Sequence, residues 1–180
     1  MPYSTTARFF HWGMAVLVLT TVPAGFLMVQ QGLDRSLQNS LFIYHKNIGI
    51  VLLFIVLARV AYRWRNPPAA LSDAVPDWQR RIAALSHLSL YVLLIVMPLA
   101  GYIRVKAGGF PIESLDAMGV PSLVPRSEAL ADTAKAIHYF SGIALSVLIG
   151  LHIAAATFHG LIRRDGVFSR MWPPVAPRSR

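Results

Sequence analysis

One uncharged stretch near the end of the chain limits the possible folds more than any other feature. The residues from His138 to His159 read HYFSGIALSVLIGLHIAAATFH and include no acidic residue, lysine or arginine. A helix over this stretch is about 32 Å long at about 1.5 Å per residue, close to the thickness of the hydrocarbon core of a bilayer. The stretch therefore predicts a membrane-spanning helix that carries three imidazoles, a costly arrangement that points to a functional role.

Three more apolar segments precede this one in a chain that is 55% hydrophobic and only 14% charged. The four predicted spans cover about 11–29, 43–62, 87–105 and 137–162. They predict an all-α integral membrane four-helix bundle, a single transmembrane domain over 1–180 with a Pro- and Arg-containing tail at 171–180 that we expect to be disordered. A signal peptide is the alternative for the first segment, but its apolar run is long and no A-x-A site follows, so we expect it to remain as an anchor.

The charges are unevenly divided between the two sides of the predicted membrane domain. The side with both termini carries eleven Lys and Arg against three acidic residues, a net of +8, whereas the other side carries six against five, a net of +1. The positive-inside rule therefore predicts that both termini are cytoplasmic. Because this asymmetry accounts for the basic character of the chain, membrane lipid is the expected surrounding and no nucleic-acid partner is expected.

The histidines are arranged in two layers. His138 and His152 are fourteen residues apart, which places them within about 40° on one face of a helix at two depths. His45 begins the second span near the level of His138, and His11 begins the first span near the level of His152. Each pair joins two helices, as a cofactor bound inside a bundle requires.

A flat macrocycle needs space beside its ligands, and small residues lie one turn after each of these histidines: Ala15, Gly49, Gly142 and Ala156. Two b haems, each held by two histidines, fit this pattern, and such haems transfer electrons because no axial position is open. Small residues also permit close helix packing, which is the alternative interpretation. A zinc or copper ion fits less well, since four histidines at two depths do not converge on one ion, and the chain has no cysteine.

Arg59 lies fourteen residues after His45 and is therefore predicted to face the bundle at the depth of the inner layer. A haem propionate is a natural partner for such a guanidinium. An arginine that extends to the membrane interface is an equally good interpretation.

The chain resembles the bacterial cytochrome b561 family, the four-span di-haem cytochromes of the inner membrane. The resemblance covers almost the whole chain and is carried by FFHW, YHKNIG, SHLSLYVLL, AIHYFSG, GLHIAAATFH and RMWP. It implies that His11 and His152 bind the inner haem iron and that His45 and His138 bind the outer haem iron.

Within this family the chain is most similar to the superoxide oxidase type, which oxidises superoxide at the periplasmic face and reduces ubiquinone within the membrane. The resemblance implies that His87 and His159 belong to a quinone site, where either could donate a hydrogen bond and a proton. The alternative is that both are interfacial histidines in the headgroup layer.

Four basic residues are predicted near the outer haem: Lys46, Arg104, Lys106 and Lys135. A positive funnel there would attract a small anion such as superoxide or ascorbate and raise its encounter rate. These residues could instead balance propionates or the five acidic residues of the same side.

Three other functions remain open at this point. Similar cytochromes act as b-type subunits that carry electrons between a partner dehydrogenase and the quinone pool, which would require a redox partner protein. Electron flow could also run from quinol to an external acceptor. A histidine-lined proton or metal-ion transporter would bind no haem and would be colourless.

Overall fold

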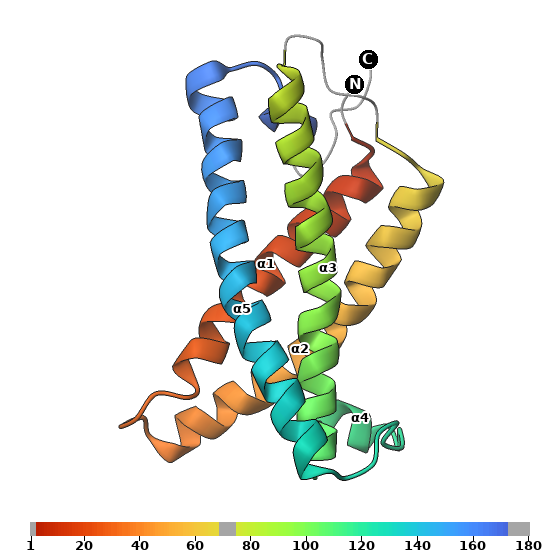
Figure 1. Ribbon diagram of the computed structural model, residues 1–180, viewed down its shortest axis with the longest axis vertical. Coiled ribbons are helices and arrows are strands. Elements are labelled where there is room, and N and C mark those ends of the chain that lie inside the picture. The colour runs from red at the N-terminus through yellow and green to blue at the C-terminus, as the bar shows by residue number, and fades with distance from the viewer. Residues whose placement is uncertain (1–2, 69–74, 173–180) are drawn as a thin grey trace.

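The computed structural model describes residues 3–68 and 75–172, and these residues form a bundle of helices without strands (Figure 1). Its long helices are α1 (Thr5–Leu27), α2 (Arg35–Arg65), α3 (Asp77–Ala107) and α5 (Glu128–Thr157), and α5 continues as the π-helix η1 (Phe158–Arg163). Two short helices, α4 (Glu113–Ala117) and the 3-10 turn η2 (Phe168–Arg170), complete the described part. All four long helices are long and apolar enough to cross a membrane, so the predicted all-α four-helix architecture is confirmed.

Polar caps extend the helices beyond their apolar middles. The Ser4 hydroxyl accepts a hydrogen bond from the Ala7 amide at the start of α1, and the Asp34 carboxylate accepts two from the amides of Ser36 and Leu37 at the start of α2. Ser127 caps α5 in the same way. These caps satisfy amides that have no partner within the helix, and α1, α2 and α5 each begin several residues before the apolar span predicted from the sequence.

The long helices pack as two antiparallel pairs. α1 lies against α2 and α3 lies against α5, and the two pairs meet mainly where α2 packs on α3. Figure 1 shows α3 and α5 side by side, with α1 and α2 crossing behind them. Among the described residues, the backbone of α5 makes few close approaches to α1 or α2. The side of α5 that faces the other pair is therefore not filled by close helix packing.

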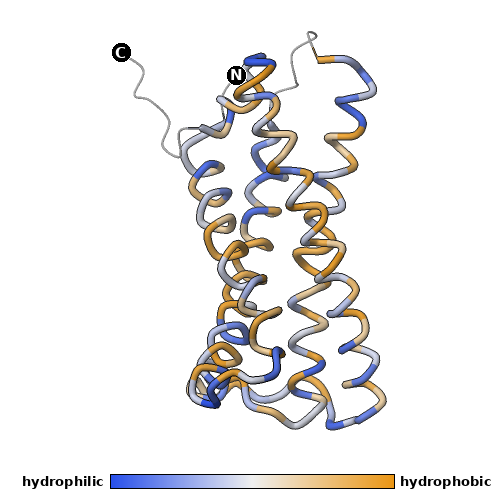
Figure 2. The backbone as a smooth tube through the Cα atoms, turned by 90° about the vertical axis from the view of Figure 1, so that its left-hand side faces the viewer, coloured by the Kyte–Doolittle hydropathy of each residue, from blue (hydrophilic) through white to orange (hydrophobic). Residues whose placement is uncertain are grey.

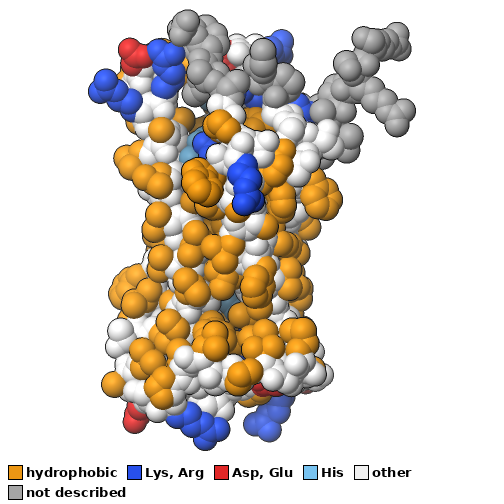
Figure 3. Space-filling view, turned by 90° about the vertical axis from the view of Figure 1, so that its right-hand side faces the viewer, with side chains coloured by type: hydrophobic (Ala, Val, Ile, Leu, Met, Phe, Trp, Pro, Cys, Tyr) orange, Lys and Arg blue, Asp and Glu red, His pale blue; other side chains and the backbone are white. Residues whose placement is uncertain are grey.

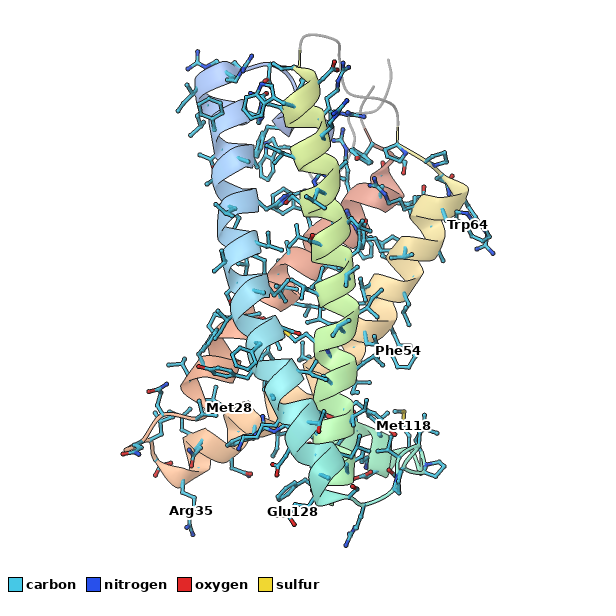
Figure 4. The ribbon with its side chains drawn as sticks, viewed as in Figure 1. Met28, Arg35, Phe54, Trp64, Met118 and Glu128 are labelled. Carbon is cyan, nitrogen blue, oxygen red and sulfur yellow. The ribbon has the colours of Figure 1, made fainter. Side chains whose placement is uncertain are left out.

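The two ends of the bundle differ in what they carry. At one end, here called the terminal end, the Tyr3 amide donates to the Arg170 carbonyl at 3.0 Å, so both ends of the described chain lie together. Figure 4 shows Trp64 at this end, and Met28, Arg35, Met118 and Glu128 at the opposite end, here called the α4 end. At the α4 end, Ile112, which directly precedes α4, and Leu115 of α4 are buried against Ile50 of α2.

Large apolar side chains cover the middle of the bundle (Figure 3). The residues of the middle are mostly hydrophobic, and hydrophilic residues are more frequent toward both ends (Figure 2). Phe54 is 65% exposed and Val147 is 58% exposed, although both lie in the middle of long helices. Exposed apolar surface of this extent is unfavourable in water and favourable against lipid tails. The chain is therefore a multi-pass membrane protein.

Candidate functional site

The imidazoles of His45 and His138 face each other at the α4 end. Their ring centroids are 5.9 Å apart and their planes are 81° to each other. A metal ion bound between two imidazoles requires about 6 Å between the ring centres, from two bonds of about 2 Å and about 1 Å within each ring. The observed separation therefore leaves room for one metal ion that both imidazoles would bind.

Hydrogen bonds orient both rings of this layer. His45 Nδ1 lies 2.9 Å from the carbonyl oxygen of Thr21, and His138 Nδ1 lies 2.8 Å from the carbonyl oxygen of Met97. A carbonyl oxygen only accepts, so each Nδ1 carries the hydrogen and donates it, which leaves the Nε2 lone pair available. Histidines that bind metals are oriented in this way by a second partner on the other nitrogen.

The space beside these rings suits a flat apolar group. A cavity at this level is lined by Val18, Val22, His45, Gly49, Leu52, Leu94, Met97, Pro98, His138 and Leu145. An added side-chain carbon would meet nothing within 4 Å at Gly49, and at Gly142 would meet only the Met97 sulfur at 4.0 Å. Both glycines thus leave open volume beside the histidines, as the sequence predicts. The donor set and the apolar lining fit a b-type haem.

The terminal end holds a second layer, which contains three imidazoles. The ring centroids of His11 and His152 are 6.2 Å apart, which again matches two ligands on one iron. The ring centroid of His87 is 5.5 Å from that of His152. His87 is exposed, whereas His11 and His152 are half-buried. The structure therefore brings together the predicted ligand pair and adds beside it a histidine predicted for the quinone site.

Both pairs of predicted ligands bridge the part of the bundle where the helices pack least closely. His138 and His152 come from α5, while their partners come from α2 and α1. These are the helices that α5 approaches little along the backbone. A group bound between the histidines would supply the missing contacts, because protein interiors do not otherwise leave such volume unfilled.

Arg59 lies half-buried at the terminal end. Its Nε donates to the Tyr91 hydroxyl at 3.0 Å, and its Nη1 donates to the Ala7 carbonyl at 3.2 Å. It is near enough to His11, His87 and His152 to interact with them electrostatically. The predicted depth of Arg59 thus agrees with its position, and its role toward a propionate stays a prediction.

His159 is part of a different cluster from His87. It lies in the π-helix η1, where its Nδ1 is 2.6 Å from Asp165 Oδ2, and Arg163 Nε is 3.5 Å from the same oxygen. Burial raises the pKa of Asp165, but hydrogen bonds from His159 and from the Val167 amide outweigh it and hold the pKa below its ordinary value. π-Helical turns are frequent at functional sites. Sequence reasoning did not identify Asp165 as a partner of His159.

Acidic residues of α4 pair with two of the four basic residues predicted for the funnel. Lys46 Nζ donates to Glu113 Oε1 at 2.6 Å and to the Pro111 carbonyl at 2.7 Å, and Lys106 pairs with Asp116. The hydrogen bond from Lys106 lowers the pKa of Asp116. Within the described residues Arg104 and Lys135 form no ion pair, and Arg104 lies near His45 and His138.

Two features of the terminal end escape sequence reasoning. Arg8, one turn before His11, is only 1% exposed, and its Nε donates to the Tyr3 carbonyl at 3.1 Å. Trp12 donates from Nε1 to the Met171 carbonyl at 3.0 Å, and its ring contacts that of Trp172 at 5.4 Å. Met171 and Trp172 belong to the predicted tail and are packed beside the site, whereas 173–180 lie outside the described residues.

Comparison with known proteins identifies the family of this chain. The family model of the prokaryotic cytochrome b561 proteins matches residues 2–174, so the chain belongs to that family and the predicted resemblance is confirmed. It is therefore a membrane electron-transfer protein with b-type haem, and its four apolar helices fit a multi-pass protein of the bacterial inner membrane.

Individual relatives cover nearly the full chain at modest identity. Cytochrome b561 homolog 2 of Escherichia coli K12 is 30% identical over 94% of this chain and 90% of the relative. Cytochrome b561 homolog 1 of the same organism is 28% identical, over 95% and 97% respectively. A probable superoxide oxidase, CybB of Yersinia pestis, is 29% identical over 95% of this chain and 96% of the relative.

Proposed function

We propose that the protein binds two b haems and acts as a superoxide:ubiquinone oxidoreductase. The observation that carries this proposal is the two histidine pairs, each at iron-ligand separation, at opposite ends of one bundle. The description of the Yersinia pestis relative as a probable superoxide oxidase supports the choice of electron donor. When bound, the two haems would supply one-electron carriers between the two ends.

The overall reaction balances as two superoxide anions, one ubiquinone and two protons giving two dioxygen molecules and one ubiquinol. Each superoxide loses one electron, and the quinone gains two electrons and two protons. The protein must therefore attract an anion at one end and deliver protons at the other.

The α4 end is the proposed superoxide side. Arg104 and Lys135 would attract the anion, because neither forms an ion pair within the described residues. Lys46 and Lys106 would contribute less, since Glu113 and Asp116 offset their charges. In this proposal the α4 end faces the periplasm and the terminal end faces the cytoplasm, as the charge asymmetry predicts.

The terminal end is the proposed ubiquinone side. His87 is exposed beside His152, so it could donate a hydrogen bond to a quinone carbonyl while His11 and His152 bind iron. His159 could supply a proton, with Asp165 accepting the hydrogen bond from its Nδ1 and thereby orienting the ring. Arg59 is the proposed partner of a haem propionate at this end.

Stopped-flow visible spectroscopy tests the proposal directly. Oxidised purified protein is mixed with superoxide, with and without a soluble ubiquinone analogue. We expect rapid appearance of reduced b-haem bands that decay when the quinone is present. Haem bands that stay oxidised in superoxide would contradict the proposed donor.

A second candidate function is a b-type cytochrome subunit that carries electrons between a partner dehydrogenase and the quinone pool. It is favoured by apolar side chains exposed around α4: Phe110 is 66%, Met118 68% and Leu123 79% exposed. Such a surface suits a docked redox partner. Purification of the native protein in a stable complex, with haems that superoxide does not reduce, would favour this function.

A further inference from the structure

The two imidazoles of the α4 end lie directly against glycines of neighbouring helices. A side-chain carbon at Gly25 of α1 would be 2.6 Å from His45 Cε1, and one at Gly101 of α3 would be 3.0 Å from both His138 Cε1 and Nδ1. For no other described glycine is an imidazole atom among the nearest neighbours within 4 Å. Neither glycine has the positive backbone angle that would explain its presence by conformation alone.

The hydrogen-bond partner of each ring lies four residues before the glycine that it contacts. His45 donates to the carbonyl of Thr21, four residues before Gly25, and His138 donates to the carbonyl of Met97, four residues before Gly101. In a helix, residues four apart lie on the same face, so one imidazole can reach both the carbonyl and the glycine. The sequences TVPAG and MPLAG each include a proline between the two positions.

These contacts act together on the direction of the ring. The carbonyl fixes which nitrogen carries the hydrogen, and the glycine allows the ring to approach the helix closely enough to make that bond. A methyl group at the glycine would push the ring away, and the ring could move only by lengthening its bond to the carbonyl. The disturbance would therefore fall on the orientation of Nε2 more than on the packing of the backbone.

We propose that Gly25 and Gly101 are positioning residues that aim His45 and His138 at the iron of the α4-end haem. This inference rests on the proposed haem at that layer. The effect should follow the distances, so the closer contact at Gly25 is more sensitive than that at Gly101. Gly150 lies in a long helix outside the lining of this cavity, and it should tolerate alanine because helix propensity favours alanine over glycine.

The experiment compares the purified full-length variants Gly25→Ala, Gly101→Ala and Gly150→Ala. Gly150 is the matched control, since it lies in a long helix and an added carbon there would meet nothing within 4 Å. Three properties are measured: haem per protein chain, the paramagnetic resonance signals of the oxidised haems, and their midpoint potentials. A role in general helix packing alone would lower the yield without altering one haem selectively.

We expect Gly25→Ala to fall from two haems toward one, a twofold loss, with the remaining haem unchanged. Gly101→Ala should keep two haems, one of which shows a shifted resonance signal and potential. If Gly25→Ala does not reach the membrane, the same readouts on Gly101→Ala decide. The inference would be overturned if Gly25→Ala and Gly101→Ala both kept two haems with signals identical to those of the control Gly150→Ala.

His45→Ala separates this inference from the function on which it depends. If His45→Ala retains both haems, the proposed ligand is wrong and the proposed function fails. If it loses one haem while the glycine variants match Gly150→Ala, only the positioning role of the glycines fails.

Discussion

The two histidine layers are built differently. At the α4 end, His45 and His138 each have one oriented nitrogen and a glycine against the ring. At the terminal end a third imidazole, His87, lies beside the pair, and Arg59 and Tyr91 are close by. The first arrangement suits a site whose ligands must stay fixed. The second has polar groups beyond those needed for two iron ligands, as a site that also handles a substrate and protons requires.

The largest expected effect comes from removing a ligand of the fixed layer. His138→Ala should lose the α4-end haem, so the haem content halves and superoxide reduces the remaining haem at least about a hundredfold more slowly. Pyridine haemochrome assays and stopped-flow spectra measure both. If the variant kept two haems and the parental rate, His138 would not be a ligand and the proposed fixed layer at the α4 end would be wrong.

At the terminal end, the three imidazoles are expected to separate into two ligands and one substrate residue. His11→Ala should lose a haem, whereas His87→Ala should keep both and slow haem reoxidation by quinone about a hundredfold. The two variants are matched because both rings belong to the same layer. Loss of a haem in His87→Ala with retention in His11→Ala would reverse the assignment.

A smaller effect is expected from Asp165→Asn, which keeps a side chain of the same shape and removes the carboxylate that accepts the hydrogen bond from His159 Nδ1. Quinone reduction should slow roughly tenfold with haem content unchanged. The pKa of Asp165 is lowered, so in the parent its carboxylate stays ionised at every pH above the ordinary pKa of an aspartate. The defect of the variant should therefore persist from about pH 5 to 8. Equal quinone rates in the variant and the parent across this range would exclude a role for the pair.

The smallest expected effect concerns the charges of the α4 end. Arg104→Gln should reduce the bimolecular rate with superoxide a few-fold and weaken its dependence on ionic strength. Glu113→Gln is the opposing control, because it removes the charge that offsets Lys46 and should raise the same rate. If both variants respond to salt as the parent does, the basic residues do not attract the substrate.

The long-range pattern of the chain was accessible from the sequence because it depends on helical periodicity. Spacings of fourteen residues placed His138 and His152 on one face, and the structure brings each beside the predicted partner. The apolar lengths predicted the number of spans, which is confirmed. These features follow from the regular geometry of helices and from bilayer thickness.

Contacts that depend on how helices pack were not accessible in this way. Gly25 and Gly101 resemble many small residues in membrane helices, and only the packed structure shows an imidazole against each. The approach of His87 to His152 depends on the rotation of α3 relative to α5, which its spacing does not fix. The pairing of Lys46 with Glu113 depends on where α4 folds back, in a connection that the sequence predicts only as polar.

The central claim is that the two histidine layers hold two distinct haems, and a potentiometric titration of the purified protein tests it most directly. The expected result is two b haems per chain, which reduce in two one-electron steps of equal amplitude at different midpoint potentials. A single haem per chain with one reduction step, or a protein without haem, would contradict the account.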